Sequence, residues 1–196
     1  MEIALDYRER LNADRDWAWV EADAYFAGQS QIWVAIELLF GRLKELDVPY
    51  ALGGVLAMFL HGYRRFTENA EVSVTPEVWH RIEKHLLGNS YSQIASSRTL
   101  KCHSTGVKIA VSLDPNIRVA TELIQGVLTL TLVAIIDDRL ISGRTPGRRR
   151  LVADVQDLII ALKLPEVFVE RLEPSVQPQY LDLWRAVDSA PPHLLC

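Results

Sequence analysis

The 196-residue sequence has little cysteine, no long apolar run and no excess of basic charge. Its two cysteines, Cys102 and Cys196, are too few and too far apart for a disulfide framework or a zinc site. We expect Cys102 to lie in a strand and Cys196 to lie in a frayed chain end. No apolar run approaches the roughly 18 residues that a membrane-spanning helix needs, so we expect no membrane segment.

The N-terminus and the net charge exclude two further classes. The chain begins Met1-Glu-Ile-Ala-Leu-Asp6, without the basic start and apolar middle of a signal peptide, so a cytoplasmic location is expected. The net charge is −4, which gives no global positive field for nucleic acid. Any contact with RNA or DNA would therefore be local. A hydrophobic share of 49% and a charged share of 23% are typical of a soluble globular protein.

Residues 50–74 form the most informative segment. A short strand is predicted over 50–52, and it is followed by the glycine pair Gly53-Gly54 and by a short apolar helix that Gly62 ends. The continuation His61-Gly-Tyr-Arg-Arg-Phe-Thr67 leads to a second strand over about 70–74. In that strand, polar residues occupy alternate positions, so one face of the sheet is polar.

This arrangement resembles the signature of the nucleotidyltransferase superfamily. In that family a glycine pair receives a triphosphate, and two carboxylates one residue apart on the next strand hold divalent metal. The resemblance implies a mixed β-sheet with flanking helices, Mg²⁺ as the cofactor of an active member, and Gly53, Gly54, Arg65 and Thr67 as nucleotide-binding residues. The backbone amides at the start of a helix suit phosphate, and an arginine fork can grip it.

The acids of the pattern are largely replaced. Residues i and i+2 of a strand point to the same face, so an Asp-x-Asp pair would aim both carboxylates at one ion. Here the pattern reads Asn69, Ala70, Glu71. The strand that should supply a third acid has Ala110 at that position, between the apolar positions Ile109 and Val111. Glu71 is the one acid that remains, and an amide oxygen is a poor substitute because Mg²⁺ favours carboxylate, phosphate and water oxygens.

Two functional interpretations follow. In the first, the chain keeps the nucleotidyltransferase fold but is catalytically impaired or inactive, and it retains the binding of a nucleoside triphosphate or a protein partner. In the second, it is an active metal-dependent nucleotidyltransferase that modifies RNA or protein, and Glu71 acts with Glu68 or Asp114. Asp114 lies on the face of Ala110 by parity, whereas Glu68 would need a strand bulge to reach that face.

Plainer structural roles are open for the same residues. The glycine pair could form a tight turn without a ligand. Glu71 could be a surface acid on a strand edge, and Arg65 could pair with Glu68 or Glu71. Asn69 could bond a neighbouring backbone amide. Thr67 could pair across the sheet.

Other charged groups also have two interpretations. His61, near a helix end, could transfer a proton or cap and pack that helix. The triplet Arg148-Arg149-Arg150 could contact an RNA backbone or form a solvated loop. Asp137-Asp138 is predicted to begin a helix, where acids suit the helix dipole.

Asp154 and Asp157, three residues apart on a predicted helix, are expected to face water.

The chain is predicted to have three parts. Residues 1–30 form a helical arm whose tryptophans favour some burial, residues 31–141 an α/β domain, and residues 142–196 a helical region after a basic loop. Within the α/β domain, helices are predicted over about 32–46 and 77–87 and further strands near 91–95, 99–104, 107–113 and 128–134, with hairpin turns at 96–97 and 105–106.

The C-terminal part carries a second resemblance. Its run Ala153-Asp-Val-Gln-Asp-Leu-Ile-Ile-Ala-Leu-Lys-Leu-Pro165, followed by Tyr180-Leu-Asp-Leu-Trp184, is similar to the C-terminal helices of small bacterial nucleotidyltransferase-like proteins. Those proteins are related to the AbiEii-type toxins of type IV toxin–antitoxin systems. The resemblance implies RNA or a protein antitoxin as partner classes.

Overall fold

A computed structural model describes residues 5–115, 117 and 120–190 of the chain, so the expectation for Cys196 lies outside the described residues. The helices are α1 (Tyr7–Ala13), α2 (Arg15–Phe26), α3 (Gln31–Glu45), α4 (Gly54–Leu60), α5 (Pro76–His85), α6 (Leu132–Gly143), α7 (Arg149–Leu162), the 3₁₀ helix η1 (Glu166–Arg171) and α8 (Gln177–Asp188). The strands are β1 (Tyr50–Leu52), β2 (Asn69–Val74), β3 (Tyr91–Gln93), β4 (Thr99–Cys102), β5 (Lys108–Leu113), β6 (Thr121–Ile124) and β7 (Val127–Leu130).

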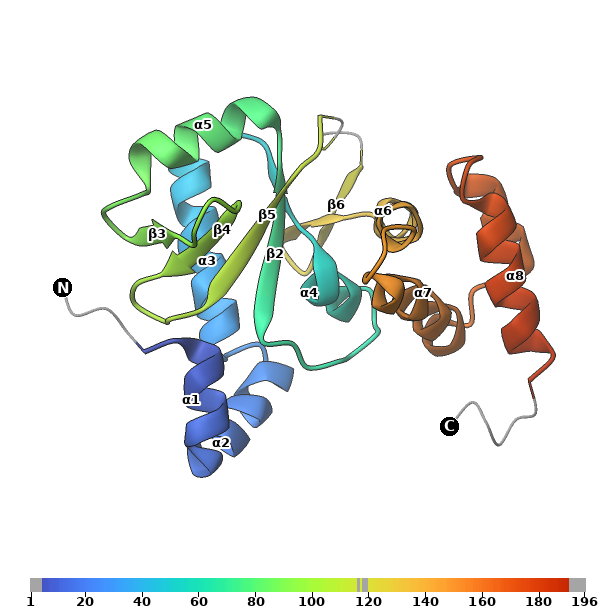
Figure 1. Cartoon of the computed structure of the whole chain (residues 1–196), viewed down its shortest axis with the longest axis horizontal. Helices are drawn as coiled ribbons and strands as arrows, with labels where there is room; N and C mark the ends of the chain where they lie inside the picture. Colours follow the sequence, from blue (N-terminus) through green and yellow to red (C-terminus); the bar gives the residue numbers. More distant parts are fainter. Residues whose placement is uncertain (1–4, 116, 118–119, 191–196) are drawn as a thin grey trace.

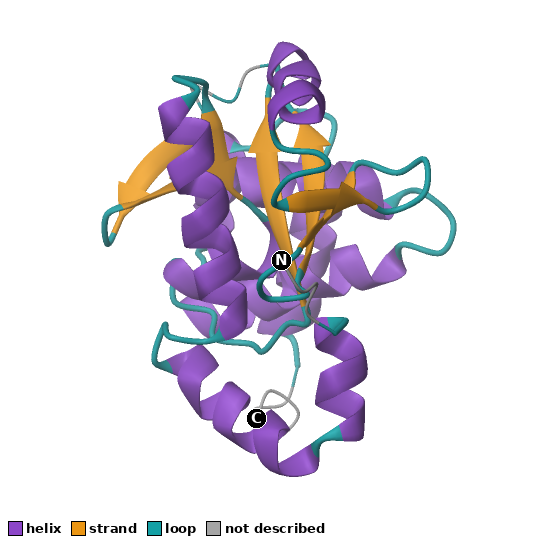
Figure 2. Ribbon diagram, turned by 90° about the vertical axis from the view of Figure 1, so that its left-hand side faces the viewer, coloured by secondary structure: helices purple, strands orange, loops and turns teal. Residues whose placement is uncertain are grey.

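The strands form one mixed sheet in the order β3-β4-β5-β2-β1-β7-β6. The central pair, β2 and β5, is parallel, and β1 runs antiparallel to β2 and parallel to β7. In Figure 1, α3 and α5 lie to one side of β2 and β5, and α4, α6 and α7 lie to the other. Figure 2 shows the strands crossing the middle of the molecule with helices packed around and below them. The predicted mixed α/β fold with flanking helices and a helical C-terminal region is confirmed.

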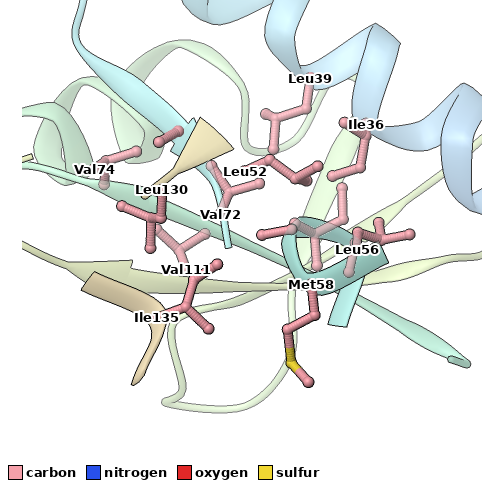
Figure 3. Close-up of a cluster of buried hydrophobic side chains, with 14 of the residues drawn as sticks. Ile36, Leu39, Leu52, Leu56, Met58, Val72, Val74, Val111, Leu130 and Ile135 are labelled. Atoms are coloured by element: carbon pink, nitrogen blue, oxygen red, sulfur yellow. The ribbon is translucent and has the colours of Figure 1, made fainter. Parts of the chain in front are cut away.

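Alternation along the central strands separates the core from the polar face. Ala70, Val72 and Val74 of β2 are buried, and in β5 the residues Ile109 and Val111 are buried as predicted. Figure 3 shows Val72, Val74 and Val111 within one apolar cluster that also holds Ile36 and Leu39 of α3 and Leu130 of β7. The intervening positions 71, 73, 110 and 112 therefore lie on the opposite face of the sheet.

The N-terminal helices are attached to this core by a few large side chains. Tyr7 of α1 and Tyr25 of α2 are buried, and the Tyr25 hydroxyl donates a hydrogen bond of 2.8 Å to the carbonyl of Arg65. The Trp17 ring contacts Tyr7 edge to face, with ring centroids 5.6 Å apart. Trp19 is 70% exposed, so burial of the arm depends on its tyrosines more than on its tryptophans.

Several element predictions are wrong between residues 121 and 150. The sequence 121–130 forms the hairpin of β6 and β7 around Gln125-Gly126, and β6 was not predicted. Helix α6 begins at Leu132, because Thr131 caps it by accepting a bond from the Ala134 N–H, so the predicted strand 128–134 ends four residues early. Arg149 and Arg150 lie in the first turn of α7, exposed but helical. Within the described residues, no helix is long and apolar enough to cross a membrane.

Candidate functional site

Glu71 lies in the middle of the sheet, so the alternative that it is a surface acid on a strand edge is wrong. Its strand, β2, is flanked by β5 and β1. The Glu71 side chain is 29% exposed, and its backbone carbonyl accepts a hydrogen bond of 2.9 Å from the Gly53 N–H. The glycine pair and the surviving acid are therefore joined directly, as the arrangement of the motif requires.

The other two positions of the acid pattern supply no carboxylate beside Glu71. In the parallel register of β2 and β5, Ala110 is the residue paired with Glu71, so its methyl group lies where the third acid of the pattern was expected. Asn69 begins β2 on the same face and is exposed, and its backbone N–H bonds the Thr67 hydroxyl at 3.4 Å. Glu71 is thus alone among the three positions.

Gly54 packs against the Glu71 side chain. It begins α4 with a φ of +61°, and a Cβ atom placed there would lie 2.7 Å from Glu71 Oε2 and 2.8 Å from Glu71 Cβ. Both the left-handed conformation and the contact favour glycine at this position. Gly53 has a φ of −121°, and a Cβ on it would find no atom closer than 3.6 Å. Only the second glycine of the pair is required by the geometry.

Arg139 of α6 was missed in the sequence and is the positive group nearest to Glu71. Its Nη2 lies 3.5 Å from Glu71 Oε2, and its Nε lies 3.7 Å from Asp154 Oδ2. The residue is 6% exposed, and its Nε has no hydrogen-bond partner among the described residues. A guanidinium group therefore faces the one remaining acid of the motif.

The arginine of the motif is bound to an acid that was expected to face water. Asp154 is 2% exposed, and its Oδ1 accepts a bond of 2.7 Å from Arg65 Nη1. The predicted pairing of Arg65 with Glu68 or Glu71 is therefore wrong. The prediction of exposure for Asp154 is also wrong, because this residue shares the inward face of α7 with Val155 and Leu158. Asp157 is 43% exposed in its side chain and accepts a 2.8 Å bond from the Tyr63 hydroxyl.

A cavity of about 460 Å³ opens beside Glu71 on the polar face of the sheet. Its acidic lining residues are Glu71, Asp114, Asp137, Asp138 and Glu173, and Arg139 is the basic residue among them. Ser73 and Ser112 also line it, and their hydroxyl oxygens lie 2.7 Å apart across β2 and β5. The lining therefore carries an excess of negative charge.

Burial and crowding act on the ionisation of these acids. Burial raises the pKa of Glu71 above its ordinary value, Arg139 opposes this shift, and the charge of Asp138 adds to it. Burial likewise raises the pKa of Asp137, although its carboxylate accepts a 3.1 Å bond from the Glu173 N–H. The prediction that Asp137-Asp138 begins a helix is wrong, because both residues lie in the middle of α6.

The alternative acids differ in position. Glu68 forms an ion pair of 2.9 Å with Arg8 of α1 and does not line the cavity. Asp114 lines the cavity together with Glu71. It lies four residues beyond Ala110, which corresponds to roughly 13 Å along an extended strand. The backbone of Asp114 is therefore well separated from that of Glu71 along the strand direction, although both residues line the cavity.

Of the residues expected to bind nucleotide, the structure brings only Gly54 to the cavity. Arg65 points to Asp154, and the Thr67 hydroxyl donates a 3.1 Å bond to the Asn69 carbonyl in a local turn. His61 caps the end of α4, and its Nε2 lies 2.9 Å from the Leu130 carbonyl oxygen. These two contacts favour the capping and packing role of His61 over a role in proton transfer.

The residues at this site do not fit the divalent ions that the resemblance implies. Among the described residues, no group of three His, Cys, Asp or Glu side chains converges as a metal site would. The acid positions hold one carboxylate, one exposed amide and one methyl group, and a guanidinium lies beside the carboxylate. Mg²⁺ is usually held through carboxylate and phosphate oxygens. The three acid positions supply a single carboxylate, that of Glu71.

A signal for the missed residues was present in the sequence. Ile135, Ile136, Arg139, Leu140 and Gly143 are spaced as one helical face, and all five are buried. The predicted helix start at Asp137-Asp138 left Ile135 and Ile136 outside this face. An arginine on the apolar face of a helix indicates a buried ion pair or a ligand contact.

Comparison with known proteins gives solved structures only. No family model and no curated protein matches the chain. A protein from Thermotoga maritima, provisionally assigned as a nucleotidyltransferase, is 17% identical with a TM-score of 0.48, and the match covers 62% of this chain and 91% of that one. An antigenic nucleotidyltransferase-like protein from Paracoccidioides brasiliensis is 19% identical with a TM-score of 0.48, covering 78% of this chain and 84% of that one. The antibiotic-resistance factor ANT(2'')-Ia is 13% identical with a TM-score of 0.48, and the match covers 82% of this chain and 95% of that one.

Proposed function

We propose that the chain is a protein of nucleotidyltransferase fold that does not transfer nucleotides and that acts by binding a nucleotide or a partner. The observation that carries the proposal is the pairing of Glu71 with Ala110 across β2 and β5. Two-metal transfer needs several carboxylates to hold the ions that neutralise developing charge. Removal of one preorganised oxyanion-hole donor from an enzyme typically costs about 3–4 kcal/mol of transition-state stabilisation, and we expect the loss of a metal-binding acid to be of similar size. The loss of two acids of three would leave little activity.

The test is an incorporation assay with the intact chain. The protein is incubated with radiolabelled nucleoside triphosphates, Mg²⁺ or Mn²⁺, and bulk RNA, and a second reaction contains Glu71→Ala. We expect no label above background in either reaction. Incorporation by the wild type that disappears in Glu71→Ala would show that the chemistry survives at this site.

A second candidate is an active nucleotidyltransferase, of the AbiEii-like toxin type or an enzyme that modifies RNA or protein. The observation in its favour is that Asp114, Asp137 and Asp138 line the same cavity as Glu71. Asp138→Asn and Asp114→Asn discriminate the two candidates, because each would abolish incorporation only if that acid serves the reaction. Under the non-catalytic proposal, neither variant changes the background.

The partner classes remain those that the resemblance implies, RNA or a protein antitoxin. Arg148, Arg149 and Arg150 are exposed at the start of α7 and offer the local positive charge that an RNA contact requires. A matched triple change to glutamine would weaken RNA binding in a salt-dependent manner if this segment is used. An unchanged affinity would assign these arginines to a solvated helix end.

A further inference from the structure

We propose that Arg139 replaces the divalent ion as the counter-charge of Glu71, and that it excludes metal from the site even when the missing acids are restored. The inference rests on the proposed non-catalytic function and concerns the cause of metal loss at the same site. If the replaced acids were the whole cause of metal loss, Asn69→Asp with Ala110→Asp would be enough to recover metal binding. The position of Arg139 predicts that it is not.

The first argument is the position of the guanidinium. Arg139 Nη2 lies 3.5 Å from Glu71 Oε2, the carboxylate oxygen that also lies beside Gly54, and all three residues line the cavity. An ion bound by Glu71 would have to lie about 2.1 Å from a carboxylate oxygen. At that place it would be in contact range of a fixed positive charge, and like charges at such separations repel strongly in a poorly solvated site.

The second argument is that Arg139 cannot move away without loss. The residue is 6% exposed on the inward face of α6, between the buried residues Ile136 and Leu140. Its other anionic neighbour, Asp154, is already bonded at 2.7 Å to Arg65. Glu71 and Asp154 therefore both compensate Arg139, and an Arg139 side chain that moved away would leave Glu71 without the basic group beside it.

The third argument concerns the space on the other side of Glu71. Gly54 leaves no room for even a Cβ atom, with a distance of 2.7 Å to Oε2. The Oε2 atom of Glu71 thus lies between the backbone of α4 and the guanidinium of α6. Mg²⁺ retains several waters in a near-octahedral shell, and this shell would need the space that Arg139 occupies.

The experiment is a Mn²⁺ titration followed by electron paramagnetic resonance, with no nucleotide and no activity readout. The proteins are the wild type, Asn69→Asp/Ala110→Asp, and this double variant with Arg139→Gln, Arg139→Lys or Arg148→Gln added. Arg148→Gln removes an exposed arginine and controls for net charge. We expect the Arg139→Gln triple variant to bind Mn²⁺ at least tenfold more tightly than each of the others, including Arg139→Lys, which keeps the charge.

Two results would overturn the inference. The first is that the double variant with Arg139 intact binds Mn²⁺ as tightly as the Arg139→Gln triple variant. The second is that neither of these two variants binds Mn²⁺. Circular dichroism melts verify folding, and Arg139→Met, which suits the apolar face of α6, takes the place of Arg139→Gln if that variant does not melt cooperatively. Failure of the proposed function is a separate outcome, since it requires incorporation of labelled nucleotide by the wild type.

Discussion

Gly54 and Glu71 are in direct contact, and a Cβ atom on residue 54 would lie 2.7 Å from Glu71 Oε2. The contact joins the start of α4 to the polar face of β2. It makes the second glycine of the pair a structural requirement of the site, independent of any ligand. The first glycine has no such constraint.

Gly54→Ala is expected to destabilise the protein by about 1–3 kcal/mol, because alanine is strained at a φ of +61° and its Cβ would displace the Glu71 carboxylate. The measurement is chemical denaturation followed by circular dichroism. Gly53→Ala is the matched control. It should cost less than about 1 kcal/mol, since the added Cβ meets no atom closer than 3.6 Å. Equal losses in the two variants would contradict the geometry of Gly54.

Asp154→Asn is expected to cost about 3–5 kcal/mol, because it leaves the guanidinium groups of Arg65 and Arg139 without their shared anion inside the protein. Asp157→Asn, three residues along the same helix, should cost below about 1 kcal/mol because its side chain is 43% exposed. Denaturant midpoints of the two variants give the comparison. A small effect of Asp154→Asn would show that Asp154 does not compensate these arginines.

Stability should depend on pH through Asp6. Burial acts to raise the Asp6 pKa, but the hydrogen bond and charge of Lys108, at 2.8 Å, and the N–H of Glu9 outweigh it, so the pKa is lowered. A lowered pKa contributes stability above the unfolded-state value of about 3.9, and this contribution is lost as the pH falls through the folded-state pKa.

Asp6→Asn should therefore be less stable than the wild type by roughly 0.5–1 kcal/mol at neutral pH, and the difference should vanish in strong acid. Asparagine keeps the cap of α1, so the loss reports the charge alone. Asp16→Asn, at an exposed acid beside Arg15, serves as the control for the removal of one acidic charge. A difference that persists at low pH would assign the effect to capping.

Calorimetry with a nucleoside triphosphate should show weak affinity that magnesium changes little. The acid pattern that would bind magnesium is replaced, and the cavity lining carries five acids against Arg139, which disfavours a polyphosphate. The titration is made with and without Mg²⁺ on the wild type. A strong magnesium requirement would contradict the proposed function.

The sequence by itself determined the central architecture. Alternation placed Val72 and Val111 in the core and Glu71 on the polar face, and helical spacing predicted the helix observed as α3. These features are local, since the periods of strand and helix are properties of a short stretch of chain. The replacement of the expected acids by Asn69 and Ala110 was also evident from the sequence.

Only the tertiary structure decided which charges meet. Arg65 and Asp154 are 89 residues apart in the chain, and Glu71 and Arg139 lie on different layers of the fold. Their pairing depends on how α6 and α7 pack against the sheet. A one-residue change in helix phase would turn Arg139 and Asp154 toward water, so no pattern of residues in the sequence alone could identify the partner of Glu71.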